Sequence, residues 1–136
     1  MGQQQLLLIT LSAIIVGVSV LVGIQMFSEN AVQANQDAVL QDMMTIASRA
    51  QDWYRKPVQL GGGGRNWTLM PSDSTAFDVL QLPQTTANGS YQITSAASGL
   101  TITGVGTEDG DGDGTPVTVV ITVDSASVSA ATFTSR

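Results

Sequence analysis

The residues whose types and spacing could do chemistry in this chain lie in one short segment, Thr107–Gly114 (TEDGDGDG). Four of the eleven acidic residues fall there, and Asp109, Asp111 and Asp113 alternate with glycines. Short carboxylates at alternate positions can wrap a hard cation, so we expect these three aspartates to be Ca²⁺ ligands in a loop between strands. The segment is not an EF-hand, because its twelfth position counted from Asp109 is a valine and no helix pair flanks it. The alternative is a solvated acidic hairpin tip that binds no metal.

The composition excludes several other kinds of chemistry. The chain has no Cys and no His, which excludes a zinc finger, a thiol nucleophile, a Ser-His-Asp triad and a disulfide framework. Asp and Glu are the only candidate acid–base groups, and no pair of them lies in a recognisable pocket motif. Gly61–Gly64 lacks the Lys-Ser/Thr pair of a phosphate-binding loop. Five scattered basic residues and a net charge of -6 argue against nucleic-acid binding. We therefore expect neither an enzyme nor a nucleic-acid partner.

Two triplets match the acceptor pattern for N-linked glycans. They begin at Asn66 (Asn-Trp-Thr) and at Asn88 (Asn-Gly-Ser). Such triplets also arise by chance in a chain rich in Ser and Thr. Asn66 and Asn88 are therefore candidate glycosylation sites, with chance occurrence as the alternative.

The N-terminal segment is the most unusual part of the sequence. The chain has 136 residues, of which 12% are charged, and every charged side chain lies at or after Glu29. The segment Leu6–Phe27 is therefore uncharged and long enough to cross a bilayer core of roughly 30 Å. A cleaved secretory signal fits poorly, because Met1–Gln5 contains no Lys or Arg and no sharp cleavage motif follows. A plain membrane anchor would explain the length of this segment.

An amphipathic helix is predicted to continue the apolar one. Glu29–Lys56 contains no Pro and no Gly, and a mostly apolar stripe recurs at spacings of four and three residues. The sequence thus predicts a single helix from about residue 3 to 55, ended by Pro57. Its first half, 1–28, is apolar all round, and its second half, 29–56, has one buried face. We expect the following residues of that face to pack on the head: Val39, Met43, Ile46, Ala50 and Trp53.

The remaining residues, 57–136, predict a small β-rich head. Gly61–Gly64 forms a flexible turn, and Arg65–Leu82 is a loop with one helical turn near Thr75–Leu80. Alternating segments rich in Val, Ile and Thr predict three or four antiparallel strands, at Ser90–Ser95, Gly99–Gly104, Pro116–Asp124 and Ala130–Thr134. Trp53 and Tyr54 are expected to attach the end of the helix to the sheet. The fold class is α+β, a long N-terminal helix packed on a small antiparallel sheet.

This arrangement of an apolar helix, an amphipathic continuation, a glycine-rich loop and a β-meander resembles the type IV pilins and pseudopilins. In that family a peptidase cuts after a Gly, and the apolar helix then leaves the membrane and packs in the core of a helical filament. The chain departs from the family in having no basic residue before Gly2. It also has Gln5 or Leu7, depending on whether Met1 or Gln3 is the mature start, where the family has a Glu. The helix-breaking Pro of many members is missing.

The apolar segment has no Pro, and its helix-weakening residues are two glycines, Gly17 and Gly23. They are compatible with local melting of the helix and equally with close helix packing. The run Gly2–Gln5 is also similar to archaeal pilins, so a bacterial and an archaeal origin both stay open.

The resemblance implies a structural subunit of an extracellular filament on the cell surface, assembled from a pool in the cytoplasmic membrane. Its partners would be identical subunits in a helical homopolymer and the pilus assembly machinery, with no cofactor other than Ca²⁺. The alternatives are a pseudopilin of a type II-like secretion system and a membrane-anchored binding domain. Cell adhesion, motility, DNA uptake and surface coating are all roles of such filaments. We expect the filament core to consist of Leu6, Leu7, Leu8, Ile9, Leu11, Ile14, Ile15, Val18, Leu21 and Val22.

Overall fold

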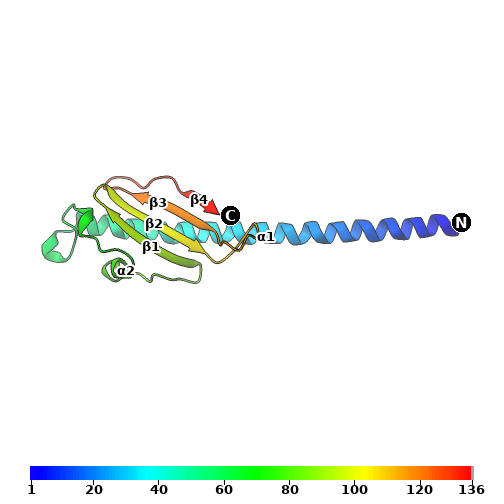
Figure 1. Cartoon of the computed structure of the whole chain (residues 1–136), viewed down its shortest axis with the longest axis horizontal. Coiled ribbons are helices and arrows are strands. Elements are labelled where there is room, and N and C mark those ends of the chain that lie inside the picture. The colour runs from blue at the N-terminus through cyan, green and yellow to red at the C-terminus, as the bar shows by residue number, and fades with distance from the viewer. Residues whose placement is uncertain (136) are drawn as a thin grey trace. The chain divides into compact units, whose positions relative to one another are not determined.

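The computed structural model describes residues 1–135, and Arg136, the last residue of the expected head, lies outside the described residues. The elements follow in the order α1 (Gly2–Arg55), the 3₁₀ turns η1 (Val58–Leu60) and η2 (Trp67–Leu69), α2 (Ser74–Leu80), β1 (Gly89–Ala96), β2 (Gly99–Gly106), β3 (Thr118–Val123) and β4 (Thr132–Ser135) (Figure 1). The fold is therefore α+β, as the sequence predicts.

The chain divides into two compact units, Met1–Ala31 and Val32–Arg136. The sequence predicts a helix over 1–56 with an apolar half, 1–28, and an amphipathic half, 29–56, followed by a head over 57–136. The division between the two units falls within α1, close to the junction of these halves, because the amphipathic half belongs to the core of the second unit. We call this second unit the head.

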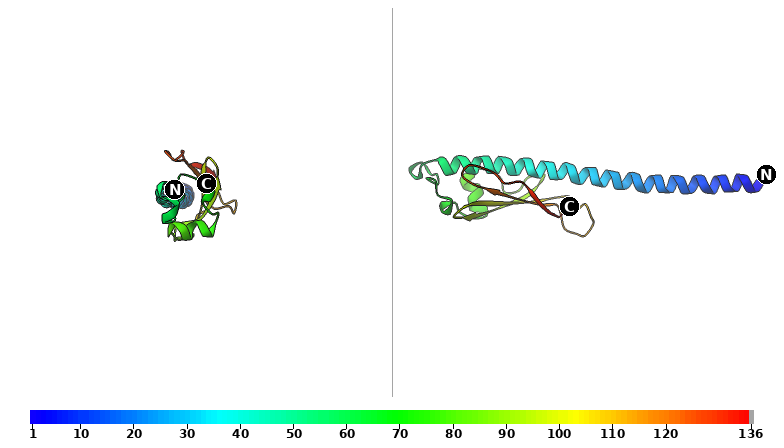
Figure 2. Two further views of the ribbon diagram at one scale, coloured as in Figure 1. Left: turned by 90° about the vertical axis from the view of Figure 1, so that its left-hand side faces the viewer. Right: turned by 90° about the horizontal axis from the view of Figure 1, so that it is seen from above.

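The amphipathic half of α1 provides one side of that core. Its buried residues follow a helical repeat, with most spacings of three, four or seven positions, and are Val32, Val39, Met43, Ile46, Ala47, Ala50 and Trp53. All five positions expected to pack on the head are among them. This spacing places the buried side chains on one face of the helix. Figure 2 shows this half of the helix lying along the sheet.

The glycine-rich loop after α1 is a hydrogen-bonded turn. The amide N–H groups of Gly63, Gly64 and Arg65 donate to the carbonyls of Trp53, Lys56 and Tyr54 at 2.8 to 2.9 Å. These bonds satisfy carbonyls that the end of a helix leaves without partners. A side chain at Gly63 would overlap the indole ring of Trp53, so the packing itself requires glycine there.

The two aromatic residues at the end of α1 attach it to the loops that follow. Trp53 packs against the glycine-rich loop at Gly63. The ring of Tyr54 stacks on Trp67 of η2, with 4.4 Å between the ring centroids. The sequence predicts that these two residues attach the helix end to the sheet. Trp53 lies in the buried core that also contains the strand residues, Tyr54 packs against that core, and both contact the loops as well.

The four strands form an antiparallel meander in the order β1-β2-β3-β4. Side chains alternate between the two faces, and a central row pairs Ile93, Ile102 and Ile121 across three strands on the buried face. The third strand begins at Thr118 rather than at Pro116. The physical reason is that proline has no N–H to donate to a ladder. The fourth strand is shifted to Thr132–Ser135, and its pairing with β3 has a register irregularity at Thr118/Val119.

Two glycines of β2 allow α1 to approach the sheet closely. A Cβ atom at Gly104 would lie 2.7 Å from Sδ of Met43 and 2.8 Å from Cγ1 of Val39, and one at Gly106 would overlap Oδ1 of Asn35. Asn35, Val39 and Met43 are four residues apart and lie on one face of the helix. Gly104 and Gly106 therefore form a gap in the sheet surface that this helix face fills.

Replacing Gly104 by alanine tests this close approach. Because the added methyl group must displace Val39 or Met43, we expect Gly104→Ala to lower the free energy of unfolding by about 1 to 3 kcal/mol. The matched control is Thr103→Val, next to it on the opposite face of β2, which should change stability by less than about 0.5 kcal/mol. Urea unfolding of the full chain in detergent measures both, and equal stabilities would contradict the proposed packing.

Candidate functional site

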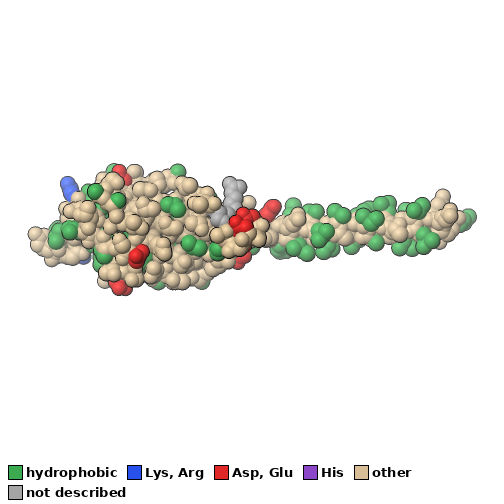
Figure 3. Space-filling model, in the orientation of Figure 1, with side chains coloured by type: hydrophobic (Ala, Val, Ile, Leu, Met, Phe, Trp, Pro, Cys, Tyr) green, Lys and Arg blue, Asp and Glu red, His purple; other side chains and the backbone are tan. Residues whose placement is uncertain are grey.

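The apolar side chains of the first unit are exposed on all sides of α1. The ten residues expected in a filament core range from 48% exposed at Val22 to 68% exposed at Leu7. Consecutive exposed residues at Leu6–Ile9 cover a full helical turn, so no side of this segment is polar. The helix is long and apolar enough to cross a membrane. Figure 3 shows these hydrophobic side chains along the N-terminal part of the helix.

Further residues extend this apolar surface beyond the ten that the sequence analysis named. They are Val16, Val20, Ile24, Met26 and Phe27, all exposed. The signal for them was present in the uncharged segment Leu6–Phe27. The exposed surface therefore includes the whole segment rather than a stripe along it.

The hydroxyl groups of this segment form hydrogen bonds within the helix. The hydroxyl groups of Thr10, Ser12 and Ser19 donate to backbone carbonyls three or four residues earlier, at 2.7 to 2.9 Å. The helix also runs through Gly17 and Gly23 without a break. Hydroxyls bonded in this way need no water, which suits a lipid or an apolar protein environment.

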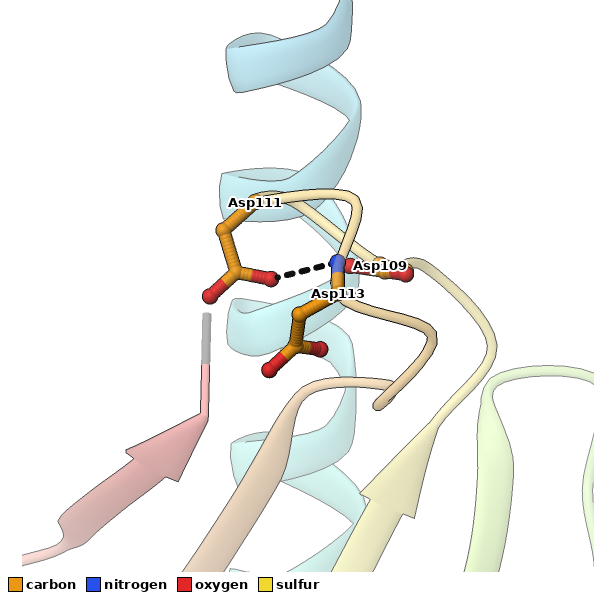
Figure 4. Close-up of side chains that lie close together, drawn as sticks. All are labelled: Asp109, Asp111 and Asp113. Carbon is orange, nitrogen blue, oxygen red and sulfur yellow. Dashed lines mark hydrogen bonds between the residues drawn. The ribbon is translucent and has the colours of Figure 1, made fainter.

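The three aspartates of the candidate calcium loop lie close together between β2 and β3 (Figure 4). One carboxylate oxygen from each of Asp109, Asp111 and Asp113 lies within 4.8 Å of the others. Oxygen ligands at such separations suit a hard cation. The loop has no helix on either side, in agreement with the exclusion of an EF-hand.

The same carboxylates also accept hydrogen bonds within the loop. Asp109 accepts from the N–H groups of Gly112 and Gly114 at 2.8 and 2.7 Å, and Asp111 accepts from the N–H of Asp113 at 3.2 Å. Hydrogen bonds from the side chain and backbone of Thr115 lower the pKa of Asp113 below its usual value. Backbone N–H groups of the loop thus bond its aspartate side chains, and Asp111 and Asp113 remain exposed at the surface.

A single side chain of α1 attaches this loop to the helix. Oδ1 of Asn35 accepts from the backbone N–H of Thr107 at 3.1 Å, and its Nδ2 donates to the carbonyl of Asn88 at 2.9 Å. The absence of a side chain at Gly106 leaves room for this amide. Asn35 was not singled out from the sequence, where it is one polar residue of an amphipathic helix.

The two candidate glycan acceptors differ in their surroundings. Asn66 is exposed, and its Oδ1 accepts from the N–H and hydroxyl of Thr68 at the start of η2. Asn88 is half-buried, and its Nδ2 donates to the carboxylate of Asp42 at 2.9 Å. Because a glycan would be attached at that nitrogen, Asn66 is the more accessible of the two.

A polar network that sequence reasoning missed is centred on Asp42 of α1. Its Oδ2 accepts from the hydroxyls of Tyr91 and Thr86 at 2.7 and 2.9 Å, and from Nδ2 of Asn88. The network therefore joins the helix to β1 and to the segment before it. The only signal in the sequence was a carboxylate next to the buried position Met43.

Burial and hydrogen bonding shift the pKa values of the two ionisable groups of this network, Asp42 and Tyr91, in opposite directions. Burial acts to raise the pKa of Asp42, but hydrogen bonds from Tyr91, Asn88 and Thr86 outweigh it and lower the pKa below its usual value. Burial raises the pKa of Tyr91 to about 12, and the neighbouring Asp42 carboxylate adds to the rise. The network thus favours a charged Asp42 and a neutral Tyr91.

The long apolar helix and the small antiparallel sheet are compatible with a pilin-like fold. Comparison with known protein families, with curated proteins and with solved structures finds no match to this chain.

Calcium addition tests the aspartate loop. With millimolar affinity typical of extracellular sites, 10 mM Ca²⁺ should stabilise the folded chain by about 1.4 kcal/mol. Asp111→Asn/Asp113→Asn should abolish this response, whereas the control Asp78→Asn, at an exposed acid of α2, should keep it. Thermal melts with Ca²⁺ and with chelator measure the effect. Identical melting temperatures would contradict Ca²⁺ binding by the aspartate loop.

The Asp42–Tyr91 network predicts a loss of stability at high pH. The pKa of Tyr91 is about 12 in the folded chain, against an ordinary value of 10.0. The contribution of this residue to the free energy of unfolding is therefore fully present below pH 10. It is lost as the pH rises toward 12, because the unfolded chain releases the proton first. Conversely, the contribution of Asp42 is lost as the pH falls through its lowered pKa.

Unfolding experiments from pH 9 to 12 check the alkaline limb. Tyr91→Phe should remove the loss of stability that is expected between pH 10 and 12. Tyr54→Phe, at the only other tyrosine in the sequence, should still show that loss. An unchanged pH profile in Tyr91→Phe would contradict the assignment.

Proposed function

We propose that this protein is a structural subunit of an extracellular type IV pilus-like filament and that it polymerises through its N-terminal helix. The observation that supports the proposal is the division of apolar surface between the two units. The head buries twenty apolar residues in a core of its own, whereas large apolar residues throughout Leu6–Phe27 remain exposed. A continuous apolar surface on this scale marks a site of protein or membrane contact.

The exposed apolar surface of Leu6–Phe27 is large enough that its burial is strongly favourable in water. Burying a Val, Leu or Ile side chain contributes roughly 1.5 to 3 kcal/mol, so ten of them contribute roughly 15 to 30 kcal/mol. Association costs about 4 to 15 kcal/mol, so contact between these helices is favourable in an aqueous surrounding. A filament built on this segment would therefore not dissociate readily into water.

Two environments can cover the segment in turn. Before assembly the helix lies in the cytoplasmic membrane, for which its length, its lack of charge and its satisfied hydroxyls are suited. After assembly, with the help of pilus assembly machinery, neighbouring copies of the same helix cover it. If Met1 is the mature start, amide hydrogen bonds of Gln5 would replace the charge pairing that a carboxylate supplies in type IV pili; if Gln3 is the start, Leu7 stands at that position and the pairing is absent.

Two other functions use the same helix differently. A pseudopilin of a secretion system would form only short polymers, and a membrane-anchored binding domain would keep the helix in the bilayer and present the sheet. Electron microscopy of sheared surface material distinguishes them. Long filaments support the pilus proposal, and protein that stays in the membrane fraction without pelleting as a polymer overturns it.

A charge within the apolar segment tests the role of that segment directly. Ile14 is 63% exposed, and Ile14→Asp would place a carboxylate among the packed helices of the filament core. We expect this variant to form no filaments, because burying an unpaired charge costs several kcal/mol in each subunit. Electron microscopy and a pelleting assay measure the result.

Two controls accompany this variant. Ile14→Val keeps an apolar side chain and should assemble normally. Thr94→Asp introduces the same charge on the exposed face of β1 and should also assemble. Normal filaments from Ile14→Asp subunits would show that the segment is not the core.

A further inference from the structure

The basic side chains of the head gather at one of its ends, whereas acidic side chains occur at both. The basic side chains that the structure describes are Arg49, Arg55, Lys56 and Arg65, which all lie in the last turns of α1 or in the loop after it. All four are exposed, and none makes an ion pair with a described residue. We call this region the basic end.

The aspartate loop lies at the other end of the head. Thr107 at the start of this loop bonds to Asn35, near the beginning of the amphipathic half of α1. Gln51, four turns later, bonds to the carbonyl of Asp124 at the opposite end of the sheet. At about 1.5 Å per residue, Asn35 and Arg55 are about 30 Å apart along the helix. Figure 3 shows Lys and Arg side chains at the left-hand end of the head, and a group of acidic side chains at the other end, with further acidic side chains elsewhere on the head.

The basic end contains a cleft. Its volume is about 210 Å³, and its lining includes Arg49, Lys56, Gly61 and Gln81 around the buried ring of Trp53. Asp52 is the one acidic residue in the lining. Arg49 and Lys56 thus place two positive charges against one negative charge in the lining, next to the indole of Trp53. Asp78 precedes the lining residue Val79 and Asp124 is bonded by Gln51, so the positive excess of the whole region is small.

The aspartate loop of another copy is opposite in charge to the basic side chains around this cleft. Between Thr107 and Val117 the loop has four acidic residues and no basic one, and its tip at Asp111–Asp113 is exposed. Glycines flank the aspartates at the tip, so no bulky side chain blocks the approach of the carboxylates. Opposite charges that are unpaired within one subunit are available for pairing between two.

We propose that the basic end of one subunit binds the aspartate loop of a second copy of this chain. Because the two surfaces differ and lie at opposite ends of the head, the contact repeats head-to-tail and forms an open row of heads. This inference rests on the proposed filament and identifies the contact between heads within it. The occupant of the cleft is therefore another subunit rather than a small anion.

A local role for the basic residues gives a different expectation. Positive side chains near the C-terminus of a helix interact favourably with its dipole. That role would make charge reversal at the basic end destabilising in a single subunit and would not involve the aspartate loop. The experiment must therefore detect proximity between subunits.

Cysteine pairs detect this proximity without interference, because the chain has no cysteine of its own. Full-length subunits carrying Lys56→Cys and Asp111→Cys are assembled in chelator at low salt and then mildly oxidised. The two positions lie at opposite ends of one head, too far apart for a disulfide within a subunit. We expect a ladder of cross-linked dimers and higher multimers on a denaturing gel. The control pair Lys56→Cys and Thr94→Cys, with the second cysteine on the exposed face of β1, should not form one.

A charge exchange provides a second, independent measurement. Asp111→Lys/Asp113→Lys and Arg55→Glu/Lys56→Glu should each raise the critical concentration for assembly at least about tenfold at low salt. The four substitutions combined should restore it to within about threefold, and 0.5 M salt should reduce all the differences.

The outcomes separate this inference from the proposed function. Normal wild-type filaments with no ladder and no rescue overturn the head-to-tail contact and leave the filament proposal intact. Absence of wild-type filaments overturns both. A ladder together with rescue supports the contact, whereas destabilised subunits without rescue assign the basic residues to the helix dipole alone.

Discussion

The close packing of α1 on β2 is the contact on which the rest of the head depends. Val39 and Met43 fill the space that Gly104 leaves open, and the buried isoleucines of three strands continue the core from there. A small sheet of four strands has one face to bury, and the amphipathic half of the helix is the surface that buries it. The same helix includes the apolar segment, so the element that completes the head also carries the surface proposed for polymerisation.

Polar side chains at intervals along α1 hold the loops of the head in place. Asn35 bonds the start of the aspartate loop, Asp42 bonds the segment around Asn88, and Gln51 bonds the turn after β3. Each of these contacts is made by a residue at the edge of the buried face. Loops attached in this way present their own side chains at defined positions, which is the condition for any specific contact with a neighbouring subunit.

The charged residues of this protein are distributed unevenly along the chain. The apolar segment has no charge, the basic residues of the described chain gather near the end of α1, and four acids gather in one loop. Backbone donors within that loop satisfy its carboxylates, so their charge is not used in holding the head together. Calcium and a neighbouring basic surface are both chemically suited to such a loop.

The sequence by itself determined the helix, its apolar and amphipathic halves, the approximate strands and the aspartate triplet, because each depends on residues close together in the chain. It did not indicate why Gly104 and Gly106 are glycines, or that Asp42 bonds a tyrosine 49 positions away. Those features depend on which helix face meets which strand, and a local pattern has no information about that pairing. The separation of the basic end from the aspartate loop is likewise a result of the fold. Only tertiary packing places the loop beside the beginning of the amphipathic helix and the basic residues about 30 Å further along it.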